Sequence, residues 1–158
     1  MTMASVQSCR VLLPDEAATL QVAARLAAVL EPNAVVYLYG DLGMGKTAFA
    51  RGVLRALGHV GAVKSPTYTL VEAYVVPQGT VFHFDLYRLH SSEELEFIGV
   101  REYCRDAWLM LIEWPECGSG VLPAPDLSIT LTPDAGGGRV LEGVADSPRA
   151  EAWLAALA

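Results

Sequence analysis

Residues 34–57 read AVVYLYGDLGMGKTAFARGVLRAL, and this stretch decides the fold class. Residues 34–39 form a short apolar run rich in β-branched and aromatic side chains, as expected of a parallel strand that is covered on both faces. The glycine-rich segment 40–47 follows directly. Residues 47–57 then favour a helix that ends at Gly58, a natural C-terminal stop. The order of strand, glycine-rich turn and helix predicts part of an α/β sheet.

The segment 40–47 matches the pattern G-x-x-x-x-G-K-[ST] without a mismatch. Its glycines allow backbone N–H groups to converge on phosphate oxygens, and the helix that begins near Lys46 adds the positive end of its dipole. Lys46 is expected to reach the β and γ phosphates, and the Thr47 hydroxyl to ligate Mg²⁺. The pattern therefore predicts a site for a purine nucleoside triphosphate, ATP with Mg²⁺; an ordinary glycine-rich turn is the alternative. The predicted nucleotide contacts are Asp41, Leu42, Gly43, Met44, Gly45, Lys46, Thr47 and Ala48.

Two acids that follow extended segments are candidates to complete the magnesium site. Asp85 follows TVFHF, and Glu113 follows WLMLI. Because WLMLI is uniformly apolar, we expect a central strand with Glu113 at its carboxyl end, where open α/β sheets bind ligands. TVFHF alternates and is expected further out, with His83 and Asp85 on one face of the strand. A solvated carboxylate at a strand end is the alternative for either acid.

The remaining segments predict helices that alternate with buried strands. Helices are expected at 14–30, at 92–98 with a cap at Ser92, and at 148–158. Extended segments are expected at 68–76, 80–85, 108–112, 126–132 and 139–145, the first two and the last two forming hairpins. The fold class predicted is α/β: one P-loop NTPase-like domain over residues 1–158, a three-layer sandwich whose central sheet is mostly parallel with antiparallel additions.

Charge and hydropathy exclude several classes of protein. The 158 residues are 53% hydrophobic, yet no apolar run reaches the roughly 18 residues of a membrane helix. Residues 1–13 lack the apolar core of a signal peptide, so a cytoplasmic location without a membrane is expected. The net charge is −7 and no basic stripe is present to hold a polyanion. Free thiols are expected at Cys9, Cys104 and Cys117, because no CxxC pair or nearby histidine suits a metal.

Five segments, taken together in chain order, indicate a resemblance to a known family. They are GDLGMGKTAFARG (40–52), KSPTYTLVE (64–72), HFDLYRL (83–89), EELEFIG (93–99) and IEWPE (112–116). Together they resemble the bacterial TsaE family, small P-loop ATPases required to make threonylcarbamoyladenosine beside the tRNA anticodon. The match spans about half of the chain, and the joint occurrence of these motifs is specific.

The resemblance implies roles for individual residues. Lys46 and Thr47 would hold phosphate and Mg²⁺, Glu113 would contact the metal, and Asp85 would act beside it in hydrolysis. A nucleotide-sensitive switch loop would consist of Ser65, Pro66 and Thr67, although residue chemistry alone equally allows an ordinary turn there. The resemblance further implies that the chain hydrolyses ATP while bound to the TsaD and TsaB proteins, and that this turnover resets their complex.

Several positions near these motifs stay open. Tyr87 and Arg88 would lie near the site by analogy, whereas a packed ring and a surface ion pair are the alternatives. Trp114 has three possible roles: nucleotide contact, core packing or partner contact. Met44 stands where the family usually has a small residue and is expected to project outward. Ala48 replaces a usual threonine, so weaker nucleotide binding at most is expected.

Two other functions fit the same chain. A small-molecule P-loop kinase would suit its length and fold. Such kinases usually need a mobile lid with several arginines, however, and the nine arginines here are scattered. A nucleotide-switched binding module with negligible catalysis is the second alternative. For all three functions, the acidic charge predicts no direct tRNA binding by the isolated chain.

Overall fold

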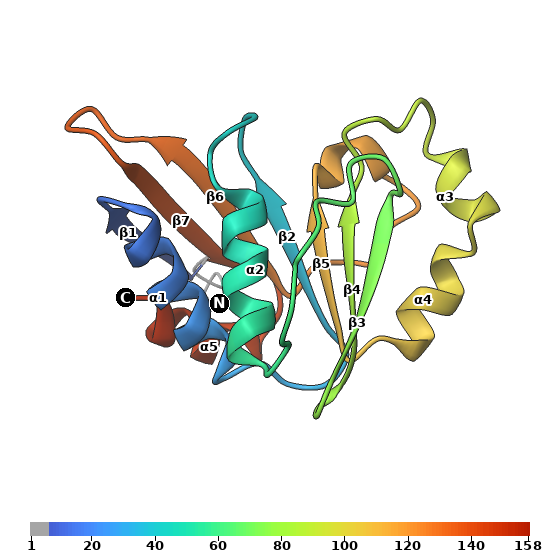
Figure 1. Ribbon diagram of the computed structural model, residues 1–158, viewed down its shortest axis with the longest axis horizontal. Coiled ribbons are helices and arrows are strands. Elements are labelled where there is room, and N and C mark those ends of the chain that lie inside the picture. The colour runs from blue at the N-terminus through green and yellow to red at the C-terminus, as the bar shows by residue number, and fades with distance from the viewer. Residues whose placement is uncertain (1–6) are drawn as a thin grey trace, which may run out of the picture.

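The computed structural model describes residues 7–158, which build one seven-stranded sheet with helices against it (Figure 1). The strand order is β1-β7-β6-β2-β5-β4-β3. In chain order the elements are β1 (Ser8–Leu13), α1 (Glu16–Ala27), β2 (Ala34–Tyr39), α2 (Lys46–Ala56), β3 (Val71–Val76), β4 (Gly79–Asp85), α3 (Glu93–Phe97), α4 (Val100–Asp106), β5 (Leu109–Glu113), the 3₁₀ helix η1 (Pro115–Gly118), β6 (Leu127–Pro133), β7 (Arg139–Ala145) and α5 (Ala150–Leu157).

The middle of the sheet is parallel and its edges are antiparallel. β6, β2, β5 and β4 pair in parallel, whereas β7 and β1 at one edge and β3 at the other join antiparallel. The register puts Leu38 of β2 and Asp85 of β4 on either side of Glu113 of β5. Three neighbouring strands thus end together at the end of the sheet where α/β folds bind ligands. The predicted α/β fold with a parallel centre and antiparallel additions is confirmed.

Helices cover both faces of the sheet and make three layers. α1, α2 and α5 pack on one face, where their apolar side chains form a core cluster with β2, β5 and β6. α3, α4 and η1 pack against β4 and β5 on the other face, and Leu95 and Val100 are buried there. Because β2 and β5 contribute side chains to both clusters, their sequences are continuously apolar rather than alternating.

Three elements were not predicted from the sequence: β1, α4 and the 3₁₀ helix η1. β1 is an edge strand with alternating exposure, and it gains its partner β7 only from the far end of the chain. Of the segment 1–13 considered for a signal peptide, residues 1–6 lie outside the described part. The second missed element, α4, follows α3 after Gly99, whose φ of 80° lets the chain turn between the two short helices.

Two local expectations are wrong. Residues 68–70 do not extend β3 but close a turn, in which the Leu70 N–H donates to the Pro66 carbonyl at 2.7 Å. The Ser92 side chain makes no capping hydrogen bond at the start of α3. The neighbouring Ser91 hydroxyl accepts from the Glu93 N–H at 3.2 Å instead.

No helix within residues 7–158 is long and apolar enough to cross a bilayer.

Candidate functional site

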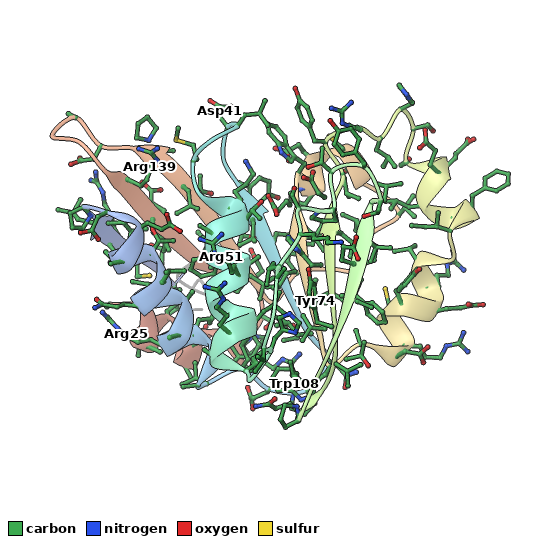
Figure 2. The ribbon with its side chains drawn as sticks, in the orientation of Figure 1. Arg25, Asp41, Arg51, Tyr74, Trp108 and Arg139 are labelled. Atoms are coloured by element: carbon green, nitrogen blue, oxygen red, sulfur yellow. The ribbon has the colours of Figure 1, made fainter. Side chains whose placement is uncertain are left out.

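The loop between β2 and α2 has the backbone geometry of a phosphate cradle. Gly45 has a φ of 99° and precedes α2 without a side chain that caps the helix, so the first N–H groups of α2 are left for a ligand. A Cβ at Gly40 would lie 2.7 Å from the Leu131 carbonyl oxygen, so the loop can pass this close to β6 only with glycine there. In Figure 2, Asp41 of this loop lies at the same end of the sheet as Arg139, whereas Trp108 lies at the opposite end.

Lys46 is buried inside this loop, with 4% of its surface exposed. Its ammonium donates to the carbonyl of Gly40 and, at 2.9 Å, to that of Asp41, and it lies 4.6 Å from the centre of the Trp114 ring. Burial lowers the pKa of Lys46, while the negative charge of Glu113 acts in the opposite direction. A buried cation in such a loop is suited to bind an anion, because the anion replaces the solvation that burial removed.

Thr47 and Glu113, the two predicted metal ligands, contact each other. The Thr47 hydroxyl lies 3.2 Å and 3.1 Å from the two carboxylate oxygens of Glu113. Glu113 is 2% exposed at the end of β5, and its Oε2 also lies 2.6 Å from Nε2 of the buried His83. A hydroxyl and a carboxylate are hard oxygen donors of the kind that Mg²⁺ prefers beside substrate phosphates. The donor set at this strand end therefore fits Mg²⁺ bound together with a nucleotide.

Asp85 lies in the same cavity and is held by two hydrogen bonds. Its Oδ2 accepts from the Thr67 hydroxyl at 3.0 Å, and its Oδ1 accepts from the Tyr87 N–H at 3.0 Å. The Thr67 hydroxyl is also 2.7 Å from that of Ser65. These contacts connect the predicted switch loop directly to Asp85. The cavity has a volume of about 300 Å³ and is lined by Leu42, Gly43, Gly45, Lys46, Thr47, Ala48, Ser65, Thr67, Asp85, Glu113 and Trp114.

Of the other residues that the sequence placed near the site, some line the cavity in the structure and others do not. Trp114 lines the cavity with a φ of 56°, an unusual conformation for a large residue, and its ring packs 4.9 Å from that of Tyr87. Arg88 does not line the cavity; its guanidinium stacks 4.5 Å above the Tyr68 ring. Met44 was expected to project outward, but it is partly buried against the core.

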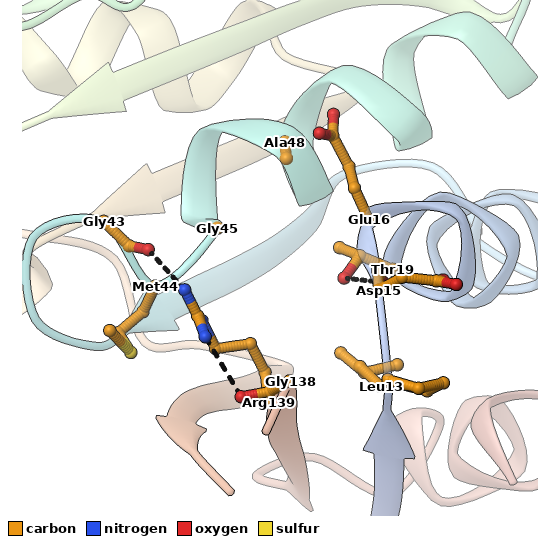
Figure 3. Close-up of a pocket in the computed structure, with 11 residues that line it drawn as sticks. Leu13, Asp15, Glu16, Thr19, Gly43, Met44, Gly45, Ala48, Gly138 and Arg139 are labelled. Atoms are coloured by element: carbon orange, nitrogen blue, oxygen red, sulfur yellow. Dashed lines mark hydrogen bonds between the residues drawn. The ribbon is translucent and has the colours of Figure 1, made fainter.

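A second cavity of about 380 Å³ lies on the other side of the loop, between the starts of α1 and α2 and the β6–β7 hairpin (Figure 3). Arg139 borders it and ties the hairpin to the loop through a 3.2 Å hydrogen bond to the Gly43 carbonyl. Gly43, Gly45 and Ala48 line both cavities. Sequence reasoning missed Thr19 and Arg139 of this cavity, because no motif spans elements so distant in the chain.

Comparison with known proteins identifies the family. The family model described as "Threonylcarbamoyl adenosine biosynthesis protein TsaE" matches residues 13–141. The chain belongs to the TsaE family. A Haemophilus influenzae protein named "tRNA threonylcarbamoyladenosine biosynthesis protein TsaE" is 48% identical over 124 residues, which cover 75% of this chain and 78% of the relative. A Bacillus subtilis protein of the same name is 35% identical over 122 residues, 77% and 75% of the two chains.

The TsaE fold is also found in a solved structure. The crystal structure of Bacillus subtilis YdiB matches with a TM-score of 0.83 and 26% sequence identity over 98% of this chain and 97% of that chain. The family resemblance drawn from the five sequence segments is thereby confirmed, and with it a place in tRNA threonylcarbamoyladenosine biosynthesis. The roles of individual residues in the cavity stay predictions.

Proposed function

We propose that this TsaE-family chain binds ATP with Mg²⁺ at the loop between β2 and α2 and hydrolyses it in support of threonylcarbamoyladenosine formation. The observation that carries the proposal is the convergence of Lys46, Thr47, Asp85 and Glu113 on one cavity. These residues come from three different elements, α2, β4 and β5, and each has the chemistry that a phosphate, a metal or a water molecule requires.

The two cavities suit different parts of the nucleotide. The triphosphate belongs in the cavity that contains Lys46, because the buried ammonium and the start of α2 both favour negative charge there. The nucleoside then extends past Ala48 into the cavity beside α1, since the backbone of the loop borders both spaces. Ala48 offers only its backbone to the nucleotide where a threonine would add a hydroxyl.

Hydrolysis requires a metal ligand and a group that orients water. Mg²⁺, held by Thr47 and Glu113, would neutralise charge on the transferred phosphate. Asp85 is positioned by Thr67 and by the Tyr87 N–H, so its carboxylate is fixed in the cavity and able to accept a proton from water. Because Thr67 belongs to the loop 65–67, a change in that loop would move Asp85.

The partners proposed are the TsaD and TsaB proteins, which would hold the tRNA. A chain with a net charge of −7 is a poor ligand for RNA, so its effect on tRNA is expected to pass through proteins that bind both. The kinase alternative called for several arginines over the phosphates, whereas the one basic residue among the described side chains that line the triphosphate cavity is Lys46.

Phosphate release measured with and without TsaD and TsaB tests this proposal. We expect slow hydrolysis by the isolated chain, a rise when both partners are present, and association with them that depends on nucleotide. In cells depleted of the protein, the modified nucleoside should fall, and wild type but not Thr47→Ala should restore it. A normal level in depleted cells, by mass spectrometry of digested tRNA, would refute the cellular role. The absence of ATP binding would refute the site itself.

A further inference from the structure

His83 is a buried polar residue whose surroundings are unusual for a strand interior. It lies on β4 with 0% of its surface exposed, on the same face as Asp85 two residues later. Its Nε2 lies 2.6 Å from Oε2 of Glu113, whereas its Nδ1 has no hydrogen-bond partner among the described residues. A histidine kept dry with half of its polar capacity unused is costly, so its single contact calls for an explanation.

The contact fixes which ring nitrogen carries hydrogen. The Glu113 carboxylate is an acceptor, so Nε2–H must donate to it. A hydrogen on Nδ1 would leave a buried N–H without an acceptor, which is less tolerable than an unpaired nitrogen lone pair. The geometry is therefore that of an Nε2–H which donates a short hydrogen bond to the Glu113 carboxylate.

This hydrogen bond restricts how Glu113 presents its oxygens. Oε2 lies 2.6 Å from Nε2 of His83, and the single hydroxyl hydrogen of Thr47 is shared between Oε2 at 3.1 Å and Oε1 at 3.2 Å. With Oε2 engaged by a rigid ring, the carboxylate cannot rotate freely, and Oε1 stays directed at the hydroxyl that would share a cation with it. Groups that orient a metal-binding carboxylate in this way typically change metal affinity or activity by about 10–100-fold when they are removed.

We propose that His83 is a positioning residue for Mg²⁺ binding: its Nε2–H fixes the Glu113 carboxylate in the orientation that, together with Thr47, receives the metal of the nucleotide complex. The inference rests on the proposed function, because it assumes that Glu113 and Thr47 are metal ligands. It predicts that the hydrogen-bond donor of His83, rather than its bulk, determines the magnesium requirement of nucleotide binding.

The test compares three variants of the full chain. His83→Leu keeps an apolar side chain in the space but removes the donor, and His83→Gln retains an N–H donor at a similar distance from the backbone. Val81→Ala is the matched control, since Val81 is buried on the same face of β4 two residues earlier and does not line the cavity. ATP affinity is measured by calorimetric titration at stepped MgCl₂ concentrations, and thermal unfolding of each variant reports its folded fraction.

We expect His83→Leu to raise the MgCl₂ concentration for half-maximal ATP binding by about 10–100-fold. His83→Gln should restore most of this shift, and Val81→Ala should lower stability without moving it. Equal magnesium dependence of wild type and His83→Leu would overturn the inference, as would an unrestored shift in His83→Gln. A wild-type chain that binds ATP without any need for magnesium would instead refute the metal site of the proposed function.

A measurement on the wild-type chain keeps the inference testable if the variants do not fold. The ring nitrogens of ¹⁵N-labelled His83 distinguish the two tautomers by NMR, and we expect Nε2 to be protonated with a strongly deshielded proton. In Glu113→Gln this proton signal should shift, because the charged acceptor is lost. Observation of the tautomer with hydrogen on Nδ1 would contradict the proposed orientation.

Discussion

At the scale of single residues, the proposed binding of ATP at the loop between β2 and α2 depends on one ammonium group. Lys46 is the basic side chain that the motif places at the triphosphate cavity, and the other lysine, Lys64, is exposed outside it. We predict that Lys46→Ala lowers ATP affinity by at least about 100-fold, as loss of a charge-assisted contact of roughly 3 kcal/mol implies. Lys64→Ala is the control and should bind ATP like wild type in calorimetric titration. Unchanged binding and hydrolysis in Lys46→Ala would contradict the phosphate-loop assignment.

The two acids at the strand ends are predicted to have different phenotypes. Glu113 contacts Thr47, so Glu113→Gln should raise the magnesium requirement of nucleotide binding. Asp85 contacts Thr67 and not Thr47, so Asp85→Asn should leave that requirement nearly unchanged and lower the hydrolysis rate by about 10²–10⁴-fold. Magnesium titrations and phosphate release on both variants separate the roles. If Asp85→Asn raised the magnesium requirement and Glu113→Gln did not, the roles assigned to the two acids would be reversed.

At the scale of elements, the approach of α1 to α2 depends on Gly52. A Cβ at this position would lie 2.7 Å from the Cβ of Ala23, so the two helices pack closely only because Gly52 has no side chain. We predict that Gly52→Ala destabilises the fold by about 1–2 kcal/mol, since overpacking outweighs the gain in helix propensity of about 1 kcal/mol. Urea unfolding measures the change.

The control for Gly52→Ala is the double variant with Ala23→Gly, which returns the space between the helices. A double-mutant cycle should give a favourable coupling of about 1 kcal/mol or more. Additive effects of the two substitutions would show that α1 and α2 are able to separate, and that the close contact is not a constraint on the packing.

The end of the sheet opposite the loop is held by the carboxylate of Asp126. It accepts from the Val35 N–H, the Ser147 hydroxyl and the guanidinium of Arg149, at distances from 2.7 to 3.1 Å. Burial by itself raises the pKa of Asp126, but the hydrogen bonds from Arg149 and Ser147 outweigh it, so the pKa lies below its ordinary value. This network joins the start of α5 to β2.

The lowered pKa of Asp126 predicts an acid-dependent stability. The stabilisation is fully present above the unfolded pKa of about 3.9 and is lost as the pH falls through the lower folded value. Asp126→Asn should therefore cost about 2 kcal/mol at pH 7, and the difference in unfolding free energy from wild type should shrink towards pH 2. Urea unfolding across this range measures it. A difference that is constant with pH would contradict the ionised network.

At the scale of the whole molecule, net charge decides how the chain meets RNA. With eleven basic and eighteen acidic residues, it has no excess of positive charge to release counterions from tRNA. We predict no measurable tRNA affinity for the isolated chain by filter binding at physiological salt, and retention of tRNA only when TsaD and TsaB are also present. Tight, salt-dependent binding by the chain alone would contradict the proposed route through partners.

Prediction from sequence succeeded where the information is local. β2 coincides with its predicted range 34–39, because continuous apolar residues ending at a glycine define a buried strand. β1 was missed, because an edge strand with alternating exposure becomes recognisable only beside its partner β7. The turn at 68–70 was mistaken for strand because its apolar and aromatic residues resemble β3, whereas the hydrogen bond from Leu70 to Pro66 sets its shape.

The sequence by itself determined the loop proposed to bind phosphate, because glycines that permit unusual backbone angles, a lysine and a threonine lie within eight consecutive residues. It also determined the family, through motifs that lie in a fixed order. Only the tertiary structure decided that Thr47 meets Glu113 across 66 positions and that His83 meets Glu113 across 30. Strand order and register set those contacts, and both depend on how two faces of one sheet bury apolar side chains, which no local pattern specifies.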